Sequence, residues 1–590
     1  MRNRQIRSAL DGIVLILSAA LFTLLALVSC KSEVKPASTP LPPPPLGRNA
    51  AGQSAAMAPP TPELIGQPQS APAPSETGGV YGGVAGGVIG TAEYIRVTAA
   101  SPKVVVDAVG TQFNTEEYGR FEENEFLAVA DNPLSTFSVD VDRAAYSNVR
   151  RFLRDGQRPP RDAVRIEEMV NYFTYDYPDP SGARPFSVTT EVAGCPWNER
   201  HRILLVGLQG RRMKTADLPA NNLVFLIDVS GSMMEPNKLP LVKQGLELLV
   251  NQLRPQDRVA IVVYAGNAGL VLPSTPGSNK GAILSAIQAL EAGGSTAGGA
   301  GIKLAYQVAK ENFLDNGNNR VILATDGDFN VGASSDGELE HLIESKRRDR
   351  IFLTVLGFGT GNIKDSKMEL LADKGNGNYS YVDTLAEARK VLVQEMGATL
   401  FTIAKDVKLQ IEFNPAKVAS YRLIGYENRL LRKEDFNNDA KDAGDIGAGH
   451  SVTALYELVP PGADAVTASV DPLKYQSTHV TAASPELLTL KLRYKEPDSE
   501  TSKLLTYAVN DNHSEIAAAS DNLRFASAVA EFGMLLRDSK HKGDATWDEA
   551  RRLAQKSLGR DYEGYRRDFL TMIDDAQNLH DTVAMKRGSD

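Results

Sequence analysis

The sequence lacks an excess of basic residues. It holds 64 Lys and Arg against 73 Asp and Glu, which gives a formal net charge of -9. A nucleic-acid-binding protein needs a positive field to displace the counterions of the phosphates, so we expect no nucleic-acid partner. Long apolar runs are also missing after residue 30. Their absence excludes transmembrane helices from the rest of the chain and gives no support to ion conduction.

Cysteine and histidine are scarce. The chain has two cysteines, Cys30 and Cys195, and seven histidines. The histidines are scattered without the His-Glu-x-x-His spacing of a zinc peptidase, and no nucleophile elbow lies near them. The remaining composition, 42% hydrophobic and 23% charged, is that of an ordinary globular protein. Because a single core stops growing at roughly 250 to 300 residues, this chain of 590 residues should contain two or more folded units.

The amino terminus has the order of an export signal. Three arginines within the first seven residues precede an apolar run from Ile13 to Val28. The run ends in Leu27-Val28-Ser29-Cys30, which resembles the lipobox of bacterial lipoproteins. This resemblance implies that residues 1–30 are a lipoprotein signal peptide and that Cys30 carries the lipid. An uncleaved anchor helix is the alternative, since about 18 apolar residues can just span a bilayer.

Both interpretations place the rest of the chain in the cell envelope, tied to a membrane. Lys31, in place of an aspartate, follows the cysteine. By resemblance to enterobacterial sorting, this favours the outer membrane over the inner membrane. Once Cys30 is acylated, Cys195 has no partner left for an intramolecular disulfide.

Residues 31–111 have the composition of a linker. They are rich in Pro, Ala, Gly and Ser, with four consecutive prolines from Pro42 to Pro45 and Gly-Gly-Val repeats between Gly78 and Gly90. Such a segment buries too little apolar surface to offset its ordering entropy. We therefore predict a disordered tether, partly stiffened by polyproline II structure. An interaction motif made by the glycine repeats is the alternative.

The central region, 221–404, alternates short apolar runs with amphipathic stretches. This pattern predicts an α/β fold with a doubly wound, mostly parallel sheet. The expected strands are Leu223–Asp228, Arg258–Tyr264, Arg320–Asp326 and Ile351–Phe358, and two of the expected crossover helices are Leu239–Leu253 and Ile302–Phe313. In open sheets of this kind, ligands bind at the loops that follow the carboxyl ends of the strands.

Oxygen-bearing side chains collect in three such loops. The first strand ends in Asp228-Val229-Ser230-Gly231-Ser232, a glycine-rich loop at 293–299 contains Thr296, and a third strand ends at Asp326, with Asp328 close behind. Carboxylates and hydroxyls are hard ligands, and Mg²⁺ needs only a few of them because it keeps waters readily.

Together the three loops resemble the metal-ion-dependent adhesion site (MIDAS) of von Willebrand factor A (VWA) domains. The resemblance implies metal ligation by Asp228, Ser230, Ser232, Thr296 and Asp326, with Asp328 as a possible outer group that tunes the site. The cofactor would be a divalent cation, with Mg²⁺ favoured and Mn²⁺ or Ca²⁺ as alternatives. Three of the five donors are neutral, so the cation would keep much of its charge and accept an Asp or Glu carboxylate from a protein partner.

Two other interpretations of these loops remain. Aspartates and serines at strand ends also serve as turn and helix-capping residues without a metal. An aspartate at a strand end is also found in haloacid dehalogenase phosphatases, but those enzymes need a second aspartate two residues later, where this chain has Ser230. The glycine-rich loop also lacks the Lys-Ser/Thr ending of a phosphate-binding loop.

The flanks of the central region carry a second resemblance. The segments 137–142, 144–153 and 163–173 before it and 445–456 after it are similar to YfbK-like bacterial VWA lipoproteins, which are often labelled calcium-activated chloride channel homologues. We therefore expect an amino-terminal flanking region at 112–220, a β-rich region at 405–520 and a helical region at 521–590. Apolar residues alternate at Val407–Phe413 and Leu488–Tyr494, whereas the helical period begins near Leu523.

Strand-like segments also precede the central region, at Phe186–Val192 and Ile203–Leu208. Neither set of strands alone makes a secure sheet. We predict that both sets pair in one β-rich unit from which the VWA domain emerges as an insertion.

Two acidic segments are weaker candidates for calcium sites. Asp140 and Asp142 alternate on a predicted strand, where a solvated strand edge or helix-start caps are the simpler interpretations. The loop at 435–445 begins like an EF-hand but has Ala440 and Ile446 where glycine and glutamate are required. A looser calcium loop and a solvated turn are the two alternatives.

The sequence thus favours a lipid-anchored envelope protein that binds a partner through a metal and is not an enzyme. A metal-dependent hydrolase and a structural envelope protein with a vestigial metal site are the alternatives.

Overall fold

The computed structural model describes residues 115–294, 298–327, 329, 336–395, 401–463 and 484–587. The predictions for Cys30, the tether at 31–111, Thr296 and Asp328 fall outside these residues. Among the described residues, none of the helices is both long and apolar enough to cross a membrane.

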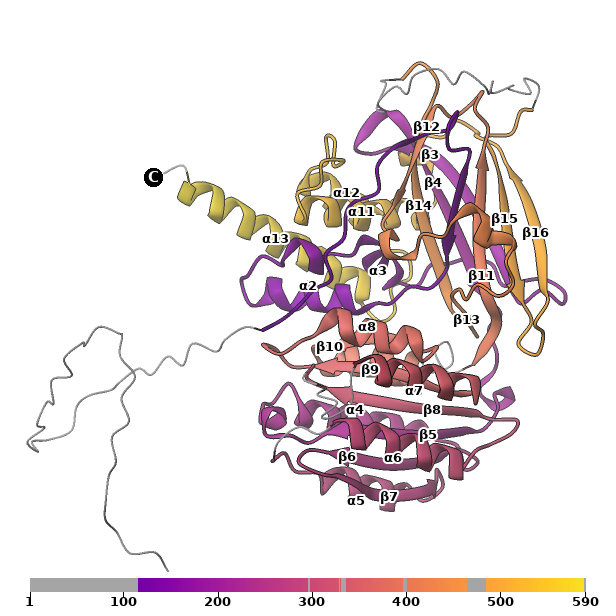
Figure 1. The fold of residues 1–590 in the computed structure, drawn as a ribbon. Helices are drawn as coiled ribbons and strands as arrows, with labels where there is room; N and C mark the ends of the chain where they lie inside the picture. Colours follow the sequence, from indigo (N-terminus) through magenta and orange to yellow (C-terminus); the bar gives the residue numbers. More distant parts are fainter. Residues whose placement is uncertain are drawn as a thin grey trace, which may run out of the picture. The chain divides into compact units, whose positions relative to one another are not determined.

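The central region forms a six-stranded sheet of order β10-β9-β8-β5-β6-β7 (Figure 1). Its strands are β5 (Asn221–Asp228), β6 (Arg258–Tyr264), β7 (Ala268–Pro276), β8 (Asn318–Thr325), β9 (Ile351–Phe358) and β10 (Tyr379–Val382). Only the edge strand β7 runs antiparallel to its neighbour. Every residue of β5 from Leu223 to Ile227 is buried, as expected for a parallel strand that is covered on both faces. The predicted doubly wound α/β fold is confirmed.

Helices cover both faces of this sheet. They are α4 (Leu239–Gln252), α5 (Lys280–Gln288), α6 (Gly298–Glu311), α7 (Asp336–Arg348), α8 (Asp365–Lys374) and α9 (Leu385–Arg389), with a short 3-10 turn η3 (Gly231–Met234) and a π-helical turn η4 (Lys390–Gln394). Apolar side chains of α4, α5 and α9 fill the core on one face. Those of α6, α7 and α8 fill the core on the other face. Because helices cover both faces of the sheet, its polar residues lie mainly at the strand ends and in the loops.

Two antiparallel sheets are built from strands on either side of the central region. One has the order β1-β12-β14-β4-β3 and the other β13-β11-β15-β16, with β2 also paired to β11. The strands are β1 (Leu127–Ala128), β2 (Leu134–Ser138), β3 (Phe186–Cys195), β4 (Asn198–Gly210), β11 (Thr402–Phe413), β12 (Ser420–Ile424), β13 (Ile446–Gly447), β14 (Ser451–Val459), β15 (Leu488–Lys495) and β16 (Ser502–Val509). Side chains from both sheets share one apolar core. The VWA-like unit is therefore an insertion between strands of one β-rich unit.

The predicted strand pairing is wrong in detail. The strands expected to pair across the insertion, β3 and β4 before it and β11 and β15 after it, lie in different sheets. The shared ladders are instead formed by β4 with β14 and by β2 with β11. The alternating pattern shows which face of a strand is buried but does not select its neighbour.

A helical layer packs against the first of these sheets. It contains α2 (Ala144–Arg154), α3 (Ile166–Asn171), α11 (Asp521–Leu536), α12 (Trp547–Lys556) and α13 (Tyr565–Arg587), and short 3-10 turns lie at η1 (Arg161–Ala163), η2 (Thr215–Asp217), η5 (Glu427–Arg429), η6 (Lys433–Asn437) and η7 (Ile516–Ala518). Cys195 is buried in the same core and makes no disulfide within the described part of the chain. The buried guanidinium of Arg150 on α2 pairs with Asp383 and Glu387, so this layer is also tied to the VWA-like unit.

Candidate metal centre

Asp228 lies at the carboxyl end of the central strand β5 and is fully buried. Its Oδ1 accepts a hydrogen bond of 2.9 Å from the backbone nitrogen of Ser230. Its Oδ2 accepts hydrogen bonds from the Tyr264 hydroxyl at 3.0 Å and from Thr325 Oγ1 at 3.3 Å. Neighbouring strands thus fix the position of this carboxylate.

The two serines of the first loop lie side by side. Their Oγ atoms are 3.0 Å apart, with Ser230 buried and Ser232 exposed at the start of η3. The two serine hydroxyls therefore lie within hydrogen-bonding distance of each other, and the residue Ser232 is exposed to solvent.

The second loop is attached to the first by backbone hydrogen bonds. Gly293 donates to the carbonyl of Val229 at 2.7 Å, and Gly231 donates to the carbonyl of Gly294 at 3.0 Å. The structure therefore brings the described start of the 293–299 loop to the Asp228 loop, as the sequence predicted. Thr296 itself remains outside the described residues.

Asp326 follows β8, the neighbour of β5, and is also fully buried. Its Oδ2 accepts hydrogen bonds from Lys238 Nζ at 3.1 Å and from Asn362 Nδ2 at 3.4 Å. Gly327 continues the chain with a φ of 107°, and a Cβ there would lie 2.4 Å from the carbonyl oxygen of Asn362. The tight turn at Gly327 therefore fixes the backbone immediately after Asp326.

Lys238 is a site residue that the sequence analysis missed. It immediately precedes α4 and is only 3% exposed. Its side chain passes over Gly359, where a Cβ would lie 2.3 Å from the Lys238 Cε. No motif spacing marks this lysine. In the sequence, Lys238 stands just before a predicted helix, where a lysine looks like an ordinary exposed residue.

Burial raises the pKa of Asp228. The hydrogen bonds from Ser230 oppose this shift, and the negative charge of Asp326 adds to it. A buried carboxylate whose pKa is raised by a neighbouring negative charge is a natural place for a cation. Among the described residues there is no group of three or more His, Cys, Asp or Glu side chains that could hold a metal, so the donors here would be two carboxylates and the hydroxyls. That hard oxygen set fits Mg²⁺.

The other acidic candidates are engaged with protein groups. Arg429 pairs with Asp142 at 2.9 Å and with Asp140 at 3.5 Å. In the 435–445 loop, Asp439 accepts a hydrogen bond of 2.6 Å from the hydroxyl of Ser502, and Asp442 pairs with an arginine of α7 at 2.5 Å. These contacts favour structural roles for both segments.

Comparison with known proteins relates the whole folded region to one group. Residues 222–394 match the family model described as von Willebrand factor type A domain, 112–205 match that described as von Willebrand factor, and 398–579 match that described as "Uncharacterized protein YfbK, C-terminal". The chain is 47% identical over 477 residues to the uncharacterized protein YfbK of Escherichia coli strain K12, which covers 79% of this chain and 82% of that relative.

Solved structures with a VWA fold also align with the chain. A von Willebrand factor type A protein from Catenulispora acidiphila aligns over 66% of this chain and 91% of its own, with 17% identity and a TM-score of 0.37. Proximal thread matrix protein 1 from the mussel byssus, whose MIDAS motif holds zinc in that structure, aligns over 30% of this chain and 45% of its own, with 24% identity and a TM-score of 0.25. The family match and the observed topology identify residues 222–394 as a VWA domain.

Proposed function

Because this chain belongs to the YfbK family and contains a VWA domain, we propose that it is a lipid-anchored envelope protein that binds a protein partner through a divalent cation. Asp228, Ser230, Ser232 and Asp326 would hold the cation, with Thr296 as the fifth protein ligand. Cys30 would carry the lipid, with the outer membrane favoured.

One observation supports this proposal above the others. Two fully buried carboxylates, Asp228 and Asp326, lie close enough to interact electrostatically, and Ser230 links Asp228 to the exposed residue Ser232 by hydrogen bonds. A cation bound there would be anchored from below by negative charge and would face solvent on its other side. The bound cation would supply one thing that these side chains lack, an electropositive position for a carboxylate of the partner.

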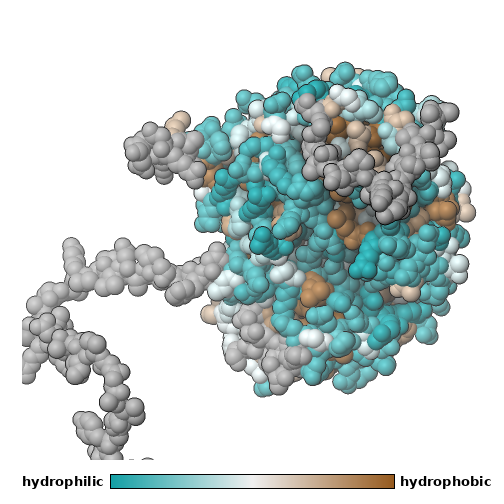
Figure 2. All heavy atoms as spheres, turned by 45° about the horizontal axis from the view of Figure 1, so that its top comes forward, coloured by the Kyte–Doolittle hydropathy of each residue, from teal (hydrophilic) through white to brown (hydrophobic). Residues whose placement is uncertain are grey.

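The surroundings of the site suit binding better than hydrolysis. Met234 is 68% exposed, two residues after Ser232, and offers an apolar contact beside the site. The position where a phosphatase of the haloacid dehalogenase type needs its second aspartate is occupied by Ser230, which is buried and bonded to its neighbours. On the face drawn in Figure 2, hydrophobic residues form small patches among hydrophilic ones. The visible part of that face therefore offers no broad apolar surface to compete with a polar, metal-centred contact.

A second candidate function is favoured by Lys238. Its buried ammonium already neutralises Asp326 at 3.1 Å. The domain would then be a structural part of the envelope whose metal site has become vestigial. The two candidates differ in one measurable property, the affinity for a divalent cation.

Calorimetric titration of the purified protein with Mg²⁺, Mn²⁺ and Ca²⁺ tests the proposal. We expect saturable binding to the wild type and loss of most of the affinity in Asp228→Ala, because a charged anchor is removed. Glu311→Gln is the matched control, since it removes an exposed carboxylate of α6 away from the loops. Equal binding by wild type and Asp228→Ala would remove the metal from the mechanism.

The partner is tested separately, by capture from envelope extract on the immobilised protein. A specific partner should be released by EDTA and rebind when Mg²⁺ is restored, because metal and partner affinities are linked. The identified partner should then bind wild type and Glu311→Gln alike but not Asp228→Ala. A partner that stays bound in EDTA would contradict the proposal.

A further inference from the structure

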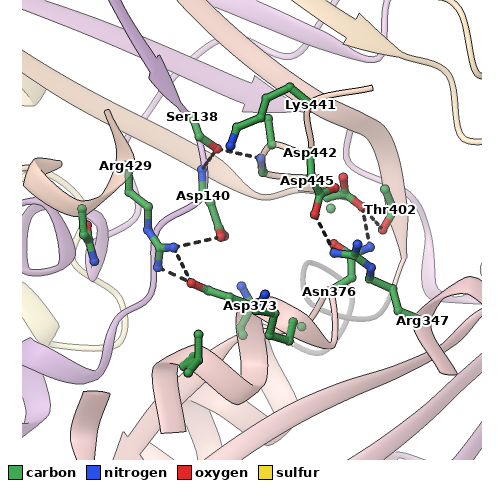
Figure 3. A pocket seen from close by; sticks show the side chains of 18 of the residues that line it. Ser138, Asp140, Arg347, Asp373, Asn376, Thr402, Arg429, Lys441, Asp442 and Asp445 are labelled. Carbon is green, nitrogen blue, oxygen red and sulfur yellow. Dashed lines mark hydrogen bonds and ion pairs between the residues drawn. The ribbon is translucent and has the colours of Figure 1, made fainter. Parts of the chain in front are cut away.

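A cavity of about 510 Å³ lies at the opposite edge of the VWA sheet from the metal centre. Its lining includes Arg320 at the amino-terminal end of β8, the segment Asn376–Asn378 before β10, and residues Lys441–Asp445 of the β-rich unit. Figure 3 shows the side chains of Asn376, Lys441 and Asp445 around this space. Its chemistry is therefore polar, and the metal centre does not account for it.

Most of the charges around the cavity are already paired. Arg429 pairs with Asp373 and Arg347 with Asp442, each at 2.5 Å, and Lys374 pairs with Glu344 at 2.7 Å. All six residues line the cavity, and Figure 3 labels the first two pairs. A ligand would have to break them in order to use their charges.

Arg320 is different, because it is a buried cation that makes no ion pair with any described residue. It is 2% exposed, its Nη1 donates to Thr354 Oγ1 at 2.8 Å, and its Nε has no hydrogen-bond partner in the described part of the chain. The guanidinium lies 5.5 Å from the ring centre of Phe352. Burial lowers the pKa of Arg320 to about 10, and the negative charge of nearby Asp445 opposes this shift.

Two further charged groups of the cavity stay outside the paired set. Lys441 is exposed at the rim and, within the described ranges, its ammonium makes no ion pair. Asp445 is partly buried and accepts hydrogen bonds from Asn376 Nδ2 at 2.9 Å and from the backbone nitrogen of Asp406 at 3.1 Å. The lining as a whole carries five acidic and five basic side chains, so its charges balance, but Arg320 and Lys441 are the two of these cations that make no ion pair within the described ranges.

We propose that this cavity binds a small oxyanion, a phosphate or a carboxylate group, with the Arg320 guanidinium as its buried anchor and Lys441 at its entrance. A planar guanidinium with unused donors matches the paired oxygens of either group. Burial raises the pKa of Asp445 to about 7, so this neighbour is partly protonated near neutral pH and repels an anion less than an ordinary aspartate would.

Calorimetric titration with sodium phosphate and with sodium succinate tests this, using sodium chloride at matched ionic strength as the blank. EDTA is present throughout, so that the result is independent of the metal centre. We expect binding of at least one probe, weakened roughly ten-fold or more in Arg320→Gln because a charge-assisted hydrogen bond is lost. Binding of phosphate alone or of succinate alone would support the site and identify which group it takes.

Arg348→Gln is the matched control, because Arg348 is exposed at the end of α7 and does not line the cavity. It should bind the probe as the wild type does. Asp445→Asn keeps the proposal testable if Arg320→Gln does not fold, and it should bind several-fold more tightly because a repelling charge is removed. The inference is overturned if neither probe binds at millimolar concentrations, if folded Arg320→Gln binds like the wild type, or if Asp445→Asn binds no more tightly.

Discussion

The ammonium nitrogen of Lys238 lies 3.1 Å from Oδ2 of Asp326, and both side chains are buried. This contact places a positive charge of the protein beside a proposed metal ligand. The domain can therefore satisfy Asp326 without a metal, and a bound cation would have to share or displace this lysine. Lys238 should therefore determine how strongly the stability of the VWA domain depends on a bound metal.

Replacing Lys238 by methionine tests that role. Without metal, the free energy of unfolding should fall by about 3 to 5 kcal/mol, because removal of one partner leaves a buried charge without compensation. Thermal denaturation with and without Mg²⁺ should show a larger stabilisation by metal in Lys238→Met than in the wild type. If Mg²⁺ raises the unfolding temperature equally in both proteins, Lys238 does not compete with the cation.

The hydroxyl ligands should matter less than the carboxylate. Ser230→Ala and Thr296→Ala should weaken Mg²⁺ binding less than Asp228→Ala does, because each removes a neutral donor. The Ser230 variant should keep a wild-type circular dichroism spectrum, since this side chain lies on a loop outside the apolar core. A serine or threonine variant that binds metal as weakly as Asp228→Ala would contradict this ranking.

Glu531 on α11 should make stability depend on pH. It is fully buried, its Oε1 accepts a hydrogen bond of 3.1 Å from the nitrogen of Thr546, and its Oε2 has no hydrogen-bond partner in the described ranges. Burial raises its pKa from 4.5 to about 8; the hydrogen bond from Thr546 opposes this shift, nearby Glu549 adds to it and Arg552 opposes it. The folded protein thus holds a proton that the unfolded chain releases.

Because the pKa is higher in the folded state, the contribution of Glu531 is full below pH 4.5 and is lost as the pH rises toward 8. The loss approaches about 1.4 kcal/mol per pH unit within that window. Glu531→Gln keeps the oxygen that accepts from Thr546 and removes the titration. Urea unfolding at pH 5 and pH 8 should show a smaller decline in stability for this variant, and equal declines would refute the assignment.

The lipid anchor is tested directly in cells. Radiolabelled palmitate should enter the wild-type protein, and Cys30→Ala should abolish the labelling. Cys195→Ala is the matched control and should still be labelled, because Cys195 is buried in the folded core. Continued labelling of Cys30→Ala would contradict the lipobox assignment.

The sequence alone was enough to predict the VWA sheet and to place Asp228 and Asp326 at the ends of two of its strands. The runs that became β5 and β8 are apolar on both faces, and the alternation with helices leaves few topologies for such runs. Asp228 ends β5 and Asp326 directly follows β8, and parallel strands bring their carboxyl ends to one edge. Local pattern and spacing therefore fix these residues.

Only the tertiary structure decided the contacts between distant segments. The pairing of β4 with β14 joins strands on opposite sides of the VWA insertion, and an alternating pattern names a buried face without naming the neighbour. In the same way, Lys238 and Arg320 look like ordinary surface cations in the sequence. A long cationic side chain can reach solvent, a buried carboxylate or a cavity, depending on how separate elements pack. Local periodicity in the sequence does not show which of these it reaches.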